Sequence, residues 1–234
     1  MILAIDSTTN PMSTGLAGQR VLLVGARHGV GPAVAAGFAH ANATLLLDDD
    51  LAAADGVALL EAAIERLGGL DVLVISAPPV RNKPVLDMTA DEMRSVVEAE
   101  LVGPALLMQA AARHMAKAGY GRIIAFMSMS GKAGVHHGVA PYAAAKGGML
   151  TYMRVLAAET AEHGVTVNAI ATALFEAQTV TMPQEKQDRL RTQIPVGRFG
   201  YNQEAAQAAL YLASPLSGFV TGECLNLSGG RFMD

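Results

Sequence analysis

One tyrosine and one lysine stand four residues apart in the alanine-rich stretch GVAPYAAAKGGML, residues 138–150. Alanine-rich runs favour helices, and a helix places residues i and i+4 on one face, so Tyr142 and Lys146 are expected side by side. An ammonium near a phenol favours the phenolate and lowers its pKa from the usual value of ~10. A phenol tuned in this way can give or take a proton at a carbonyl or alcohol oxygen near neutral pH. The alternative is that the pair belongs by accident to a solvated helix face.

A serine hydroxyl aimed at the same oxygen would complete such a site. Ser128 closes the apolar run GRIIAFMS, 14 residues before Tyr142. If that run is a parallel strand, its carboxyl end lies where such sheets bind ligands. Ser130, just past the same strand, is the second choice for this role.

Short apolar runs alternate with helical patterns along the chain, which predicts an α/β domain built on a doubly wound parallel sheet with helices on both faces. The predicted strands are VLLV, TLLL, LDVLVIS, GRIIAFMS, GVTVNAIA and ECLNLSGG. The predicted helices cover residues 32–41, the stretch DGVALLEAAIERLGG, residues 89–118 behind a capping box of Thr89 and Glu92, residues 141–163, and a segment capped by Asn202. Residues 1–17 are expected to form a flexible arm, residues 18–234 a single domain, and residues 172–200 an irregular segment.

The connection between the second and third predicted strands is short. Only 19 residues separate Asp50 from Leu70. One crossover needs at least about 10–12 residues, so this length fits a single helix with its loops. The sequence therefore predicts about six strands, with TLLL at the edge of the sheet.

The stretch VGARHGVG follows the first predicted strand and opens a helix. In that position Gly25 would allow a tight turn and Gly29 would let the backbone approach a pyrophosphate, which a helix N-terminus stabilises. The spacing is G-x3-G-x-G through Gly31, and a plain strand-to-helix turn is the alternative reading.

An acidic triplet, residues 48–50, ends the second predicted strand. An acidic residue at this place in dinucleotide folds accepts hydrogen bonds from the adenosine ribose, and Asp49 lies 24 residues after Gly25. Its charge would repel a 2′-phosphate, so NAD is favoured over NADP. Arg27 and His28, within the loop, would instead suit the extra phosphate of NADP. A solvated strand end is the alternative for the triplet.

Composition narrows the possible functions. The 234-residue chain is 51% hydrophobic and 16% charged, which suits a large core and argues against disorder. A net charge of -4, no basic cluster and 5% aromatic residues give no support to nucleic-acid binding. No apolar run reaches ~18 residues and no basic n-region opens the chain, so neither a membrane span nor a signal peptide is expected. The single cysteine, Cys224, fits a reducing cytoplasm, and no set of residues has zinc-ligand spacing.

From Arg20 to Phe232 the chain resembles the short-chain dehydrogenase/reductase family. The resemblance rests on GARHGVG, GLDVLV, GRIIAFMS, YAAAK, GVTVNAIA, GRFG and TGECLNLSGG in this order. It implies a Rossmann-type fold, a nicotinamide cofactor, and interconversion of an alcohol and a carbonyl. It implies that Ser128 polarises the substrate oxygen, that Tyr142 is the general acid/base, and that Lys146 binds the nicotinamide ribose and lowers the Tyr142 pKa. The cofactor-binding residues expected are Gly25, Arg27, His28, Gly29, Val30, Gly31, Asp49, Ala77, Tyr142, Lys146, Thr172 and Phe175.

The chain departs from the family pattern beside this core. Val24 replaces a threonine, ISAP (residues 75–78) replaces N-N-A-G, and Thr172 with Ala173 replaces P-G. Glu100 takes the place of the family's relay asparagine, where its charge would act on Tyr142. Residues 174–200 occupy the position of the substrate lid, and Phe175 and Met182 are its candidates for substrate contact. By analogy, a homodimer or homotetramer is expected through residues 90–118 and 141–163.

Two other functions remain open. The first is a non-redox enzyme similar to halohydrin dehalogenases, against which Lys146 and the glycine loop argue. The second is a cofactor-binding protein with little turnover, which the short crossover and the ISAP change favour.

Overall fold

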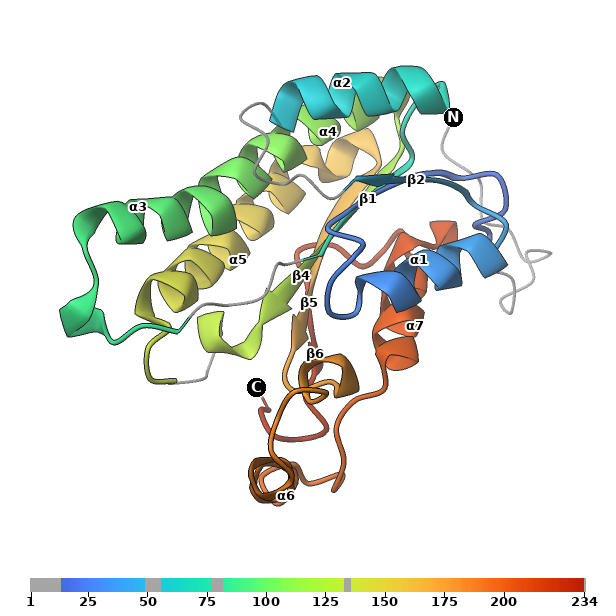
Figure 1. Ribbon diagram of the computed structural model, residues 1–234. Coiled ribbons are helices and arrows are strands. Elements are labelled where there is room, and N and C mark those ends of the chain that lie inside the picture. The colour runs from blue at the N-terminus through green and yellow to red at the C-terminus, as the bar shows by residue number, and fades with distance from the viewer. Residues whose placement is uncertain (1–13, 49–55, 77–81, 133–135, 234) are drawn as a thin grey trace.

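Six parallel strands form one sheet in the computed structural model of the chain, which describes residues 14–48, 56–76, 82–132 and 136–233 (Figure 1). The strands are β1 (Arg20–Val24), β2 (Thr44–Asp48), β3 (Val72–Ile75), β4 (Gly121–Ser128), β5 (Val165–Thr172) and β6 (Cys224–Leu227). Their order across the sheet is β2-β1-β3-β4-β5-β6. The chain leaves β1 toward one edge and returns on its other side to β3. This reversal creates a topological switch point between β1 and β3, where sheets of this kind bind ligands.

Helices cover both faces of the sheet, as predicted (Figure 1). One face carries α2 (Gly56–Leu67), α4 (Gly103–Ala118) and α5 (Ala140–Thr160), and the other carries α1 (Gly31–His40) and α7 (Asn202–Ala213). Two more helices are α3 (Ala90–Val97) and α6 (Gln184–Arg191). Short 3-10 turns lie at Val85–Asp87, Met129–Gly131, Ala161–His163, Glu176–Gln178 and Pro215–Ser217. The predicted doubly wound α/β fold is confirmed.

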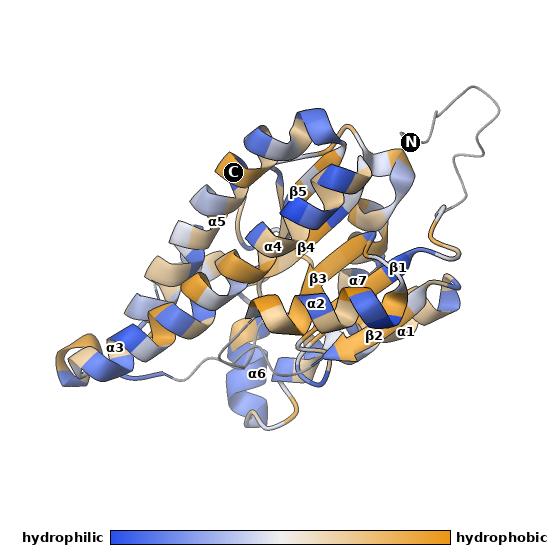
Figure 2. Cartoon of the chain, turned by 90° about the horizontal axis from the view of Figure 1, so that it is seen from above, coloured by the Kyte–Doolittle hydropathy of each residue, from blue (hydrophilic) through white to orange (hydrophobic). Residues whose placement is uncertain are grey.

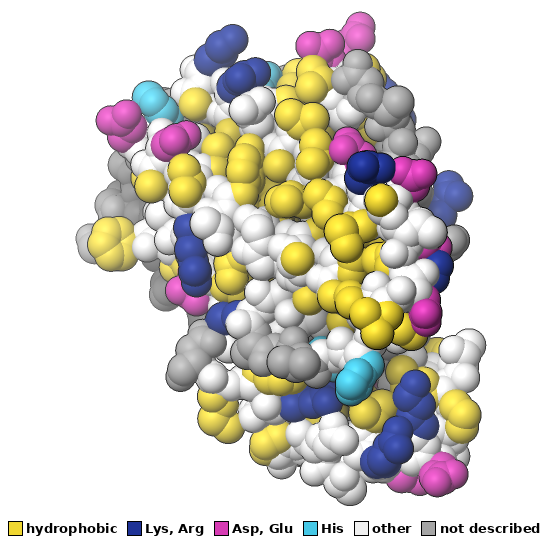
Figure 3. All heavy atoms as spheres, turned by 90° about the vertical axis from the view of Figure 1, so that its left-hand side faces the viewer, with side chains coloured by type: hydrophobic (Ala, Val, Ile, Leu, Met, Phe, Trp, Pro, Cys, Tyr) yellow, Lys and Arg dark blue, Asp and Glu magenta, His cyan; other side chains and the backbone are white. Residues whose placement is uncertain are grey.

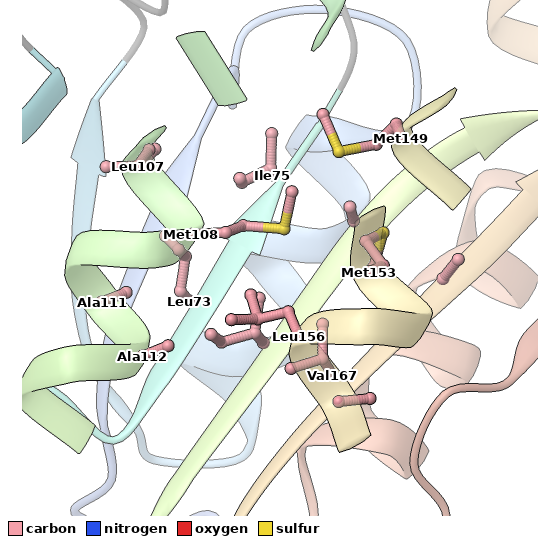
Figure 4. Close-up of a cluster of buried hydrophobic side chains, with 14 of the residues drawn as sticks. Leu73, Ile75, Leu107, Met108, Ala111, Ala112, Met149, Met153, Leu156 and Val167 are labelled. Carbon is pink, nitrogen blue, oxygen red and sulfur yellow. The ribbon is translucent and has the colours of Figure 1, made fainter. Parts of the chain in front are cut away.

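Side chains alternate between two buried clusters, because successive residues of a strand point to opposite faces. Leu22 joins the cluster under α2, α4 and α5, whereas its neighbour Leu23 joins the cluster under α1 and α7. Figure 4 shows the first cluster, to which α4 contributes Met108, α5 contributes Leu156 and β3 contributes Leu73. Figure 2 shows the central strands as strongly hydrophobic, while the covering helices carry hydrophilic residues outward. This double burial explains why the strands appear in the sequence as unbroken apolar runs.

The shortened crossover is also confirmed. Within residues 56–71 the structure places one helix, α2, and no strand before β3. β2 is therefore the edge strand, as predicted, and none of its residues is fully buried, whereas all four residues of β3 are.

Three local expectations need correction. Residues 172–200 were expected to be irregular, but they contain the two-turn helix α6. Asn202 was expected to cap the last helix, but it is the first helical residue; Tyr201 is the N-cap, and its N–H donates to the Glu204 carboxylate at 2.8 Å. Within the predicted arm, Leu16 is fully buried in the cluster under α1 and α7, so the core reaches back at least to this residue.

The helix over residues 90–118 is interrupted by an internal feature. The predicted capping box is present: Thr89 Oγ1 accepts from the Glu92 N–H at 3.2 Å, and the Glu92 carboxylate accepts from the Thr89 N–H at 2.8 Å. A π-helical turn, Glu98–Val102, then joins α3 to α4. By length and composition alone this 29-residue helix could cross a membrane, although no such span was expected from the sequence. The buried side chains of α4 belong to the core, which is the arrangement of a helix packed on its own sheet.

Candidate functional site

The carboxyl end of β4 is held close to α5. The 3-10 turn after Ser128 packs on the helix so tightly that a Cβ at Gly131 would lie 2.6 Å from Lys146 Cβ and 2.8 Å from the Gly147 amide nitrogen. Only glycine allows the backbone to approach this closely. Ser128 Oγ accepts a hydrogen bond from the Ser130 N–H at 3.1 Å. The strand end is thereby set beside the first turns of α5.

Tyr142 lies on α5 next to this strand end and is buried, with 7% of its surface exposed. Burial raises the pKa of Tyr142 to about 12, and the negative charge of Glu100 adds to the rise, whereas a hydrogen bond with the Ser128 side chain opposes it. Ser128 and Tyr142, predicted as partners, both line the same cleft, and the Ser128 hydroxyl acts on the pKa of the phenol. Ser130, the second choice, lies 3.1 Å from His136 Nδ1 through its Oγ and has a different partner.

Lys146 follows one helical turn after Tyr142, on the same buried face of α5. Its Nζ lies 5.7 Å from the centroid of the Tyr142 ring and 2.9 Å from Glu100 Oε2. Lys146 was expected to lower the pKa of Tyr142, but the shift runs in the opposite direction. The physical reason is that burial dominates, and that a carboxylate accompanies the ammonium at the site.

Glu100 owes its position to the π-helical turn. It is the one buried residue of Glu98–Val102. Apart from the Lys146 ammonium, its Oε2 atom has no hydrogen-bond partner among the described residues. π-Helical turns are rare and frequent at functional sites. The sequence indicated that the Glu100 charge would act on Tyr142, but not that it would form an ion pair with Lys146.

The glycine loop lies at the switch point of the sheet. Gly25 has a φ of 78°, and a Cβ there would lie 2.5 Å from the Ser76 carbonyl oxygen at the end of β3. Gly29 also has a positive φ, 57°, and open space where a side chain would stand. Val30 is the N-cap of α1, which begins at Gly31. A phosphate group approaching this loop would meet exposed backbone and a helix N-terminus, so the residues present suit a dinucleotide.

The remaining predicted cofactor residues that the structure describes lie in the glycine loop and at or just beyond the end of β5. Arg27 and His28 are exposed in the loop. Thr172 ends β5 and donates from Oγ1 to the Met127 carbonyl at 3.1 Å, and Phe175 is buried just beyond it. Asp49 and Ala77 lie outside the described residues.

A single cleft of about 620 Å³ connects these parts. Its lining includes Gly29, Val30 and Ser76 as well as Ser128 and Tyr142. The predicted nucleotide loop and the predicted catalytic pair therefore open into the same space.

The outer walls of this cleft come from the lid region and the C-terminal turn. Phe175 and Met182, the predicted candidates for substrate contact, both line it. His136, Arg231 and Phe232 line it as well, and no role was predicted for Arg231 or Phe232. The only signal for Arg231 is a cation directly after the pair Gly229–Gly230, which is weak. The described residues contain no group of three or more metal-ligating side chains.

Comparison with known proteins agrees with this geometry. The family model described as "Enoyl-(Acyl carrier protein) reductase" matches residues 50–231. The 3-oxoacyl-[acyl-carrier-protein] reductase FabG of Escherichia coli is 32% identical over 240 aligned positions, which cover 92% of this chain and 98% of that protein.

Two solved structures share the fold over almost their whole length. A candidate short-chain alcohol dehydrogenase from Sinorhizobium meliloti superposes with a TM-score of 0.85 at 30% identity, covering 94% of this chain and 98% of the other. A gluconate 5-dehydrogenase from Burkholderia cenocepacia, solved with NADP and tartrate, superposes with a TM-score of 0.86 at 29% identity, covering 94% and 97%.

Proposed function

Because the chain belongs to the short-chain dehydrogenase/reductase family, whose members are NAD(P)-dependent oxidoreductases acting on alcohols and carbonyls, we propose that it interconverts an alcohol and a carbonyl with Tyr142 as the general acid/base. The observation that carries this proposal is the common cleft. It brings the loop at Gly29 and the Ser128–Tyr142 pair to one space.

The chain offers a consistent set of groups to a dinucleotide. The backbone from Gly25 to Gly31 and the N-terminus of α1 suit the pyrophosphate, and Thr172 and Phe175 contribute to the wall of the same cleft. Bound nicotinamide supplies the hydride donor or acceptor. Lys146 is close enough to Tyr142 for its ammonium to bind the nicotinamide ribose and to act on the phenol. For this, the ammonium must interact with the ribose in addition to the Glu100 carboxylate.

Tyr142 and Ser128 handle the proton and the substrate oxygen. With a pKa raised to about 12, the phenol is protonated at neutral pH, which is the form that donates a proton to a carbonyl oxygen as it becomes an alcohol. The Ser128 hydroxyl, hydrogen-bonded to that phenol, is positioned to hold the same oxygen. Oxidation of an alcohol needs the phenolate, so it should require alkaline pH. Segment 174–200 acts as the substrate lid in this proposal.

We assign NAD as the preferred cofactor. Asp48 ends β2 at the edge of the sheet, and the acidic triplet that it begins would repel a 2′-phosphate. The exposed Arg27 and His28 are the features that favour NADP instead.

Assembly into a homodimer or homotetramer is part of the same proposal. Figure 3 shows hydrophobic side chains gathered in a band over the face formed by α3, α4 and α5. Met93, Leu106 and Val155 are exposed there, beside a groove of about 420 Å³ between α4 and α5. An apolar face of this kind is suited to a second copy of the same chain, which would bury it across a two-fold axis. We also propose a cytoplasmic location, which the single cysteine of the chain supports.

Calorimetric titration with NADH and NADPH, followed by turnover on a panel of aldehydes and ketones, tests the proposal. We expect tighter binding of NADH and reduction of at least one carbonyl. Binding of neither nucleotide would contradict it. Release of halide from vicinal halohydrins without a nucleotide would identify the halohydrin-dehalogenase-like alternative. Nucleotide binding without any turnover would identify a cofactor-binding protein.

A further inference from the structure

Charge is distributed unevenly in the cleft. The described residues that line it include no aspartate or glutamate, and Arg231 is the one among them with a permanent charge. The other lining side chains are apolar, hydroxyl-bearing or amide, apart from the imidazole of His136. A cleft with this lining favours an anionic ligand.

Arg231 lies in a turn after β6 that is held by several hydrogen bonds. Ser228 Oγ accepts from the Phe232 N–H at 3.2 Å and donates to the Phe232 carbonyl at 2.9 Å. The Arg231 N–H donates to the Ser228 carbonyl at 3.2 Å. These bonds fix the backbone from which the guanidinium projects.

The guanidinium itself is held only by neutral groups. Its Nη2 donates to Gln193 Oε1 at 2.7 Å, and its Cζ lies 5.4 Å from the centroid of the Phe232 ring. Within the described part of the chain it forms no ion pair, whereas Arg20 pairs with Asp71 and Arg198 with Glu204. Arginine has five N–H donors, so most remain available for a ligand.

His136 adds a second polar group on the same side. Its ring packs edge-on against Phe232, with centroids 6.5 Å apart, and its Nδ1 lies 3.1 Å from Ser130 Oγ. Phe232 thus lies in contact with both Arg231 and His136, which brings the two polar side chains to one wall.

We propose that Arg231 binds a carboxylate of the substrate, so that the reaction converts an oxo acid into a hydroxy acid or the reverse. The planar guanidinium matches a carboxylate with two parallel hydrogen bonds, which gives orientation as well as attraction. Holding the acid end at Arg231 would direct the carbonyl end toward Ser128 and Tyr142, which line the same cleft. This inference rests on the proposed function and adds its substrate class.

Matched pairs of substrates test it: straight-chain oxo acids of four to eight carbons against their methyl esters, with wild type, Arg231→Met and Arg231→Lys. We expect the wild type to prefer at least one acid to its ester. Arg231→Met should raise KM for that acid by about 10- to 100-fold, the scale of lost hydrogen bonds to a charged group, and leave the ester unchanged. The KM of Arg231→Lys for that acid should lie between those of wild type and Arg231→Met, because lysine keeps the positive charge but cannot form the two parallel hydrogen bonds of a guanidinium.

Two controls distinguish the loss of substrate binding from a general effect of removing an arginine and from an effect on cofactor binding. Arg66→Met removes an exposed arginine from the end of α2, at the opposite edge of the sheet, and should change nothing. The NADH dissociation constant of Arg231→Met should match that of wild type. A weakened NADH affinity would overturn the inference by assigning Arg231 to the cofactor.

The outcomes also separate this inference from the proposed function. Equal turnover of acids and esters by wild type and Arg231→Met would overturn the inference and leave the reductase standing. If no carbonyl is reduced, calorimetry with the corresponding hydroxy acids decides. Binding that is lost in Arg231→Met would support an acid-binding cleft without the proposed chemistry, and absence of binding to wild type would overturn the inference.

Discussion

The Lys146 ammonium lies 2.9 Å from the Glu100 carboxylate, and both side chains are buried behind Tyr142. A buried ion pair is costly to break by removing one partner, because the other charge is left uncompensated. Here the pair has a second consequence. The carboxylate helps to keep the phenol in its protonated form, which favours proton donation at neutral pH over proton abstraction.

Replacing Glu100 with glutamine should lower the pKa of Tyr142, because it removes a negative charge that raises it. Burial still acts, so the pKa stays above its usual value. Alcohol oxidation needs the phenolate. As the pH is raised, its rate should therefore begin to increase at a lower pH in Glu100→Gln than in wild type. At a fixed pH below the pKa, a tenfold gain in phenolate accompanies each fall of about one in the pKa.

The matched control for this change is Glu98→Gln, an exposed carboxylate on the same π-helical turn. The measurement is kcat/KM for oxidation as a function of pH. Equal profiles for Glu100→Gln and wild type, or the same change in both variants, would show that Glu100 does not act on the phenol.

The contact between Gly131 and α5 predicts a stability effect. Gly131→Ala would place a Cβ 2.6 Å from Lys146 Cβ, so the strand end must move away from the helix. Overpacking of this kind costs about 1–3 kcal/mol in the free energy of unfolding, measured by urea denaturation. Turnover should fall as well, because Ser128 moves with the turn.

Gly148→Ala is the comparison for this substitution. Gly148 lies in α5 where an added Cβ would meet Leu101 at an ordinary 3.4 Å, so the substitution should be neutral or stabilise the helix by up to about 1 kcal/mol. Equal effects of the two substitutions would contradict the packing argument.

The apolar face over α3, α4 and α5 predicts that the protein has the mass of a dimer or tetramer in solution. Leu106→Glu places a charge in the proposed contact between copies and should reduce the dimer or tetramer to monomer, as measured by light scattering. Val57→Glu, on an exposed position of α2, should keep the wild-type mass. A monomeric wild type would remove the basis for this interface.

The fold could be predicted from the sequence because its signals are local. Buried parallel strands appear as apolar runs, and the length between Asp50 and Leu70 limits what the crossover can contain. The contact of Ser128 with Tyr142 could also be predicted, since the carboxyl end of a strand and the start of the next helix meet at one edge.

The details that were missed depend on geometry that residue types do not encode. The π-helical turn buries Glu100 toward Lys146, and no spacing rule for a regular α-helix predicts that. Arg231 reaches the cleft through a turn that is set by Ser228 hydrogen bonds. Leu16, in a polar segment, is buried because it packs into the cluster under α1 and α7, which its local sequence does not reveal.

The central claim, that Tyr142 is the general acid/base, is tested most directly by kcat for carbonyl reduction in Tyr142→Phe. We predict a loss of about 10²- to 10⁴-fold, with NADH affinity retained. The control is Tyr152→Phe on the same helix, whose hydroxyl donates to the Ala105 carbonyl at 3.0 Å outside the cleft and should leave kcat unchanged. A Tyr142→Phe variant that reduces the substrate as fast as wild type would contradict the account.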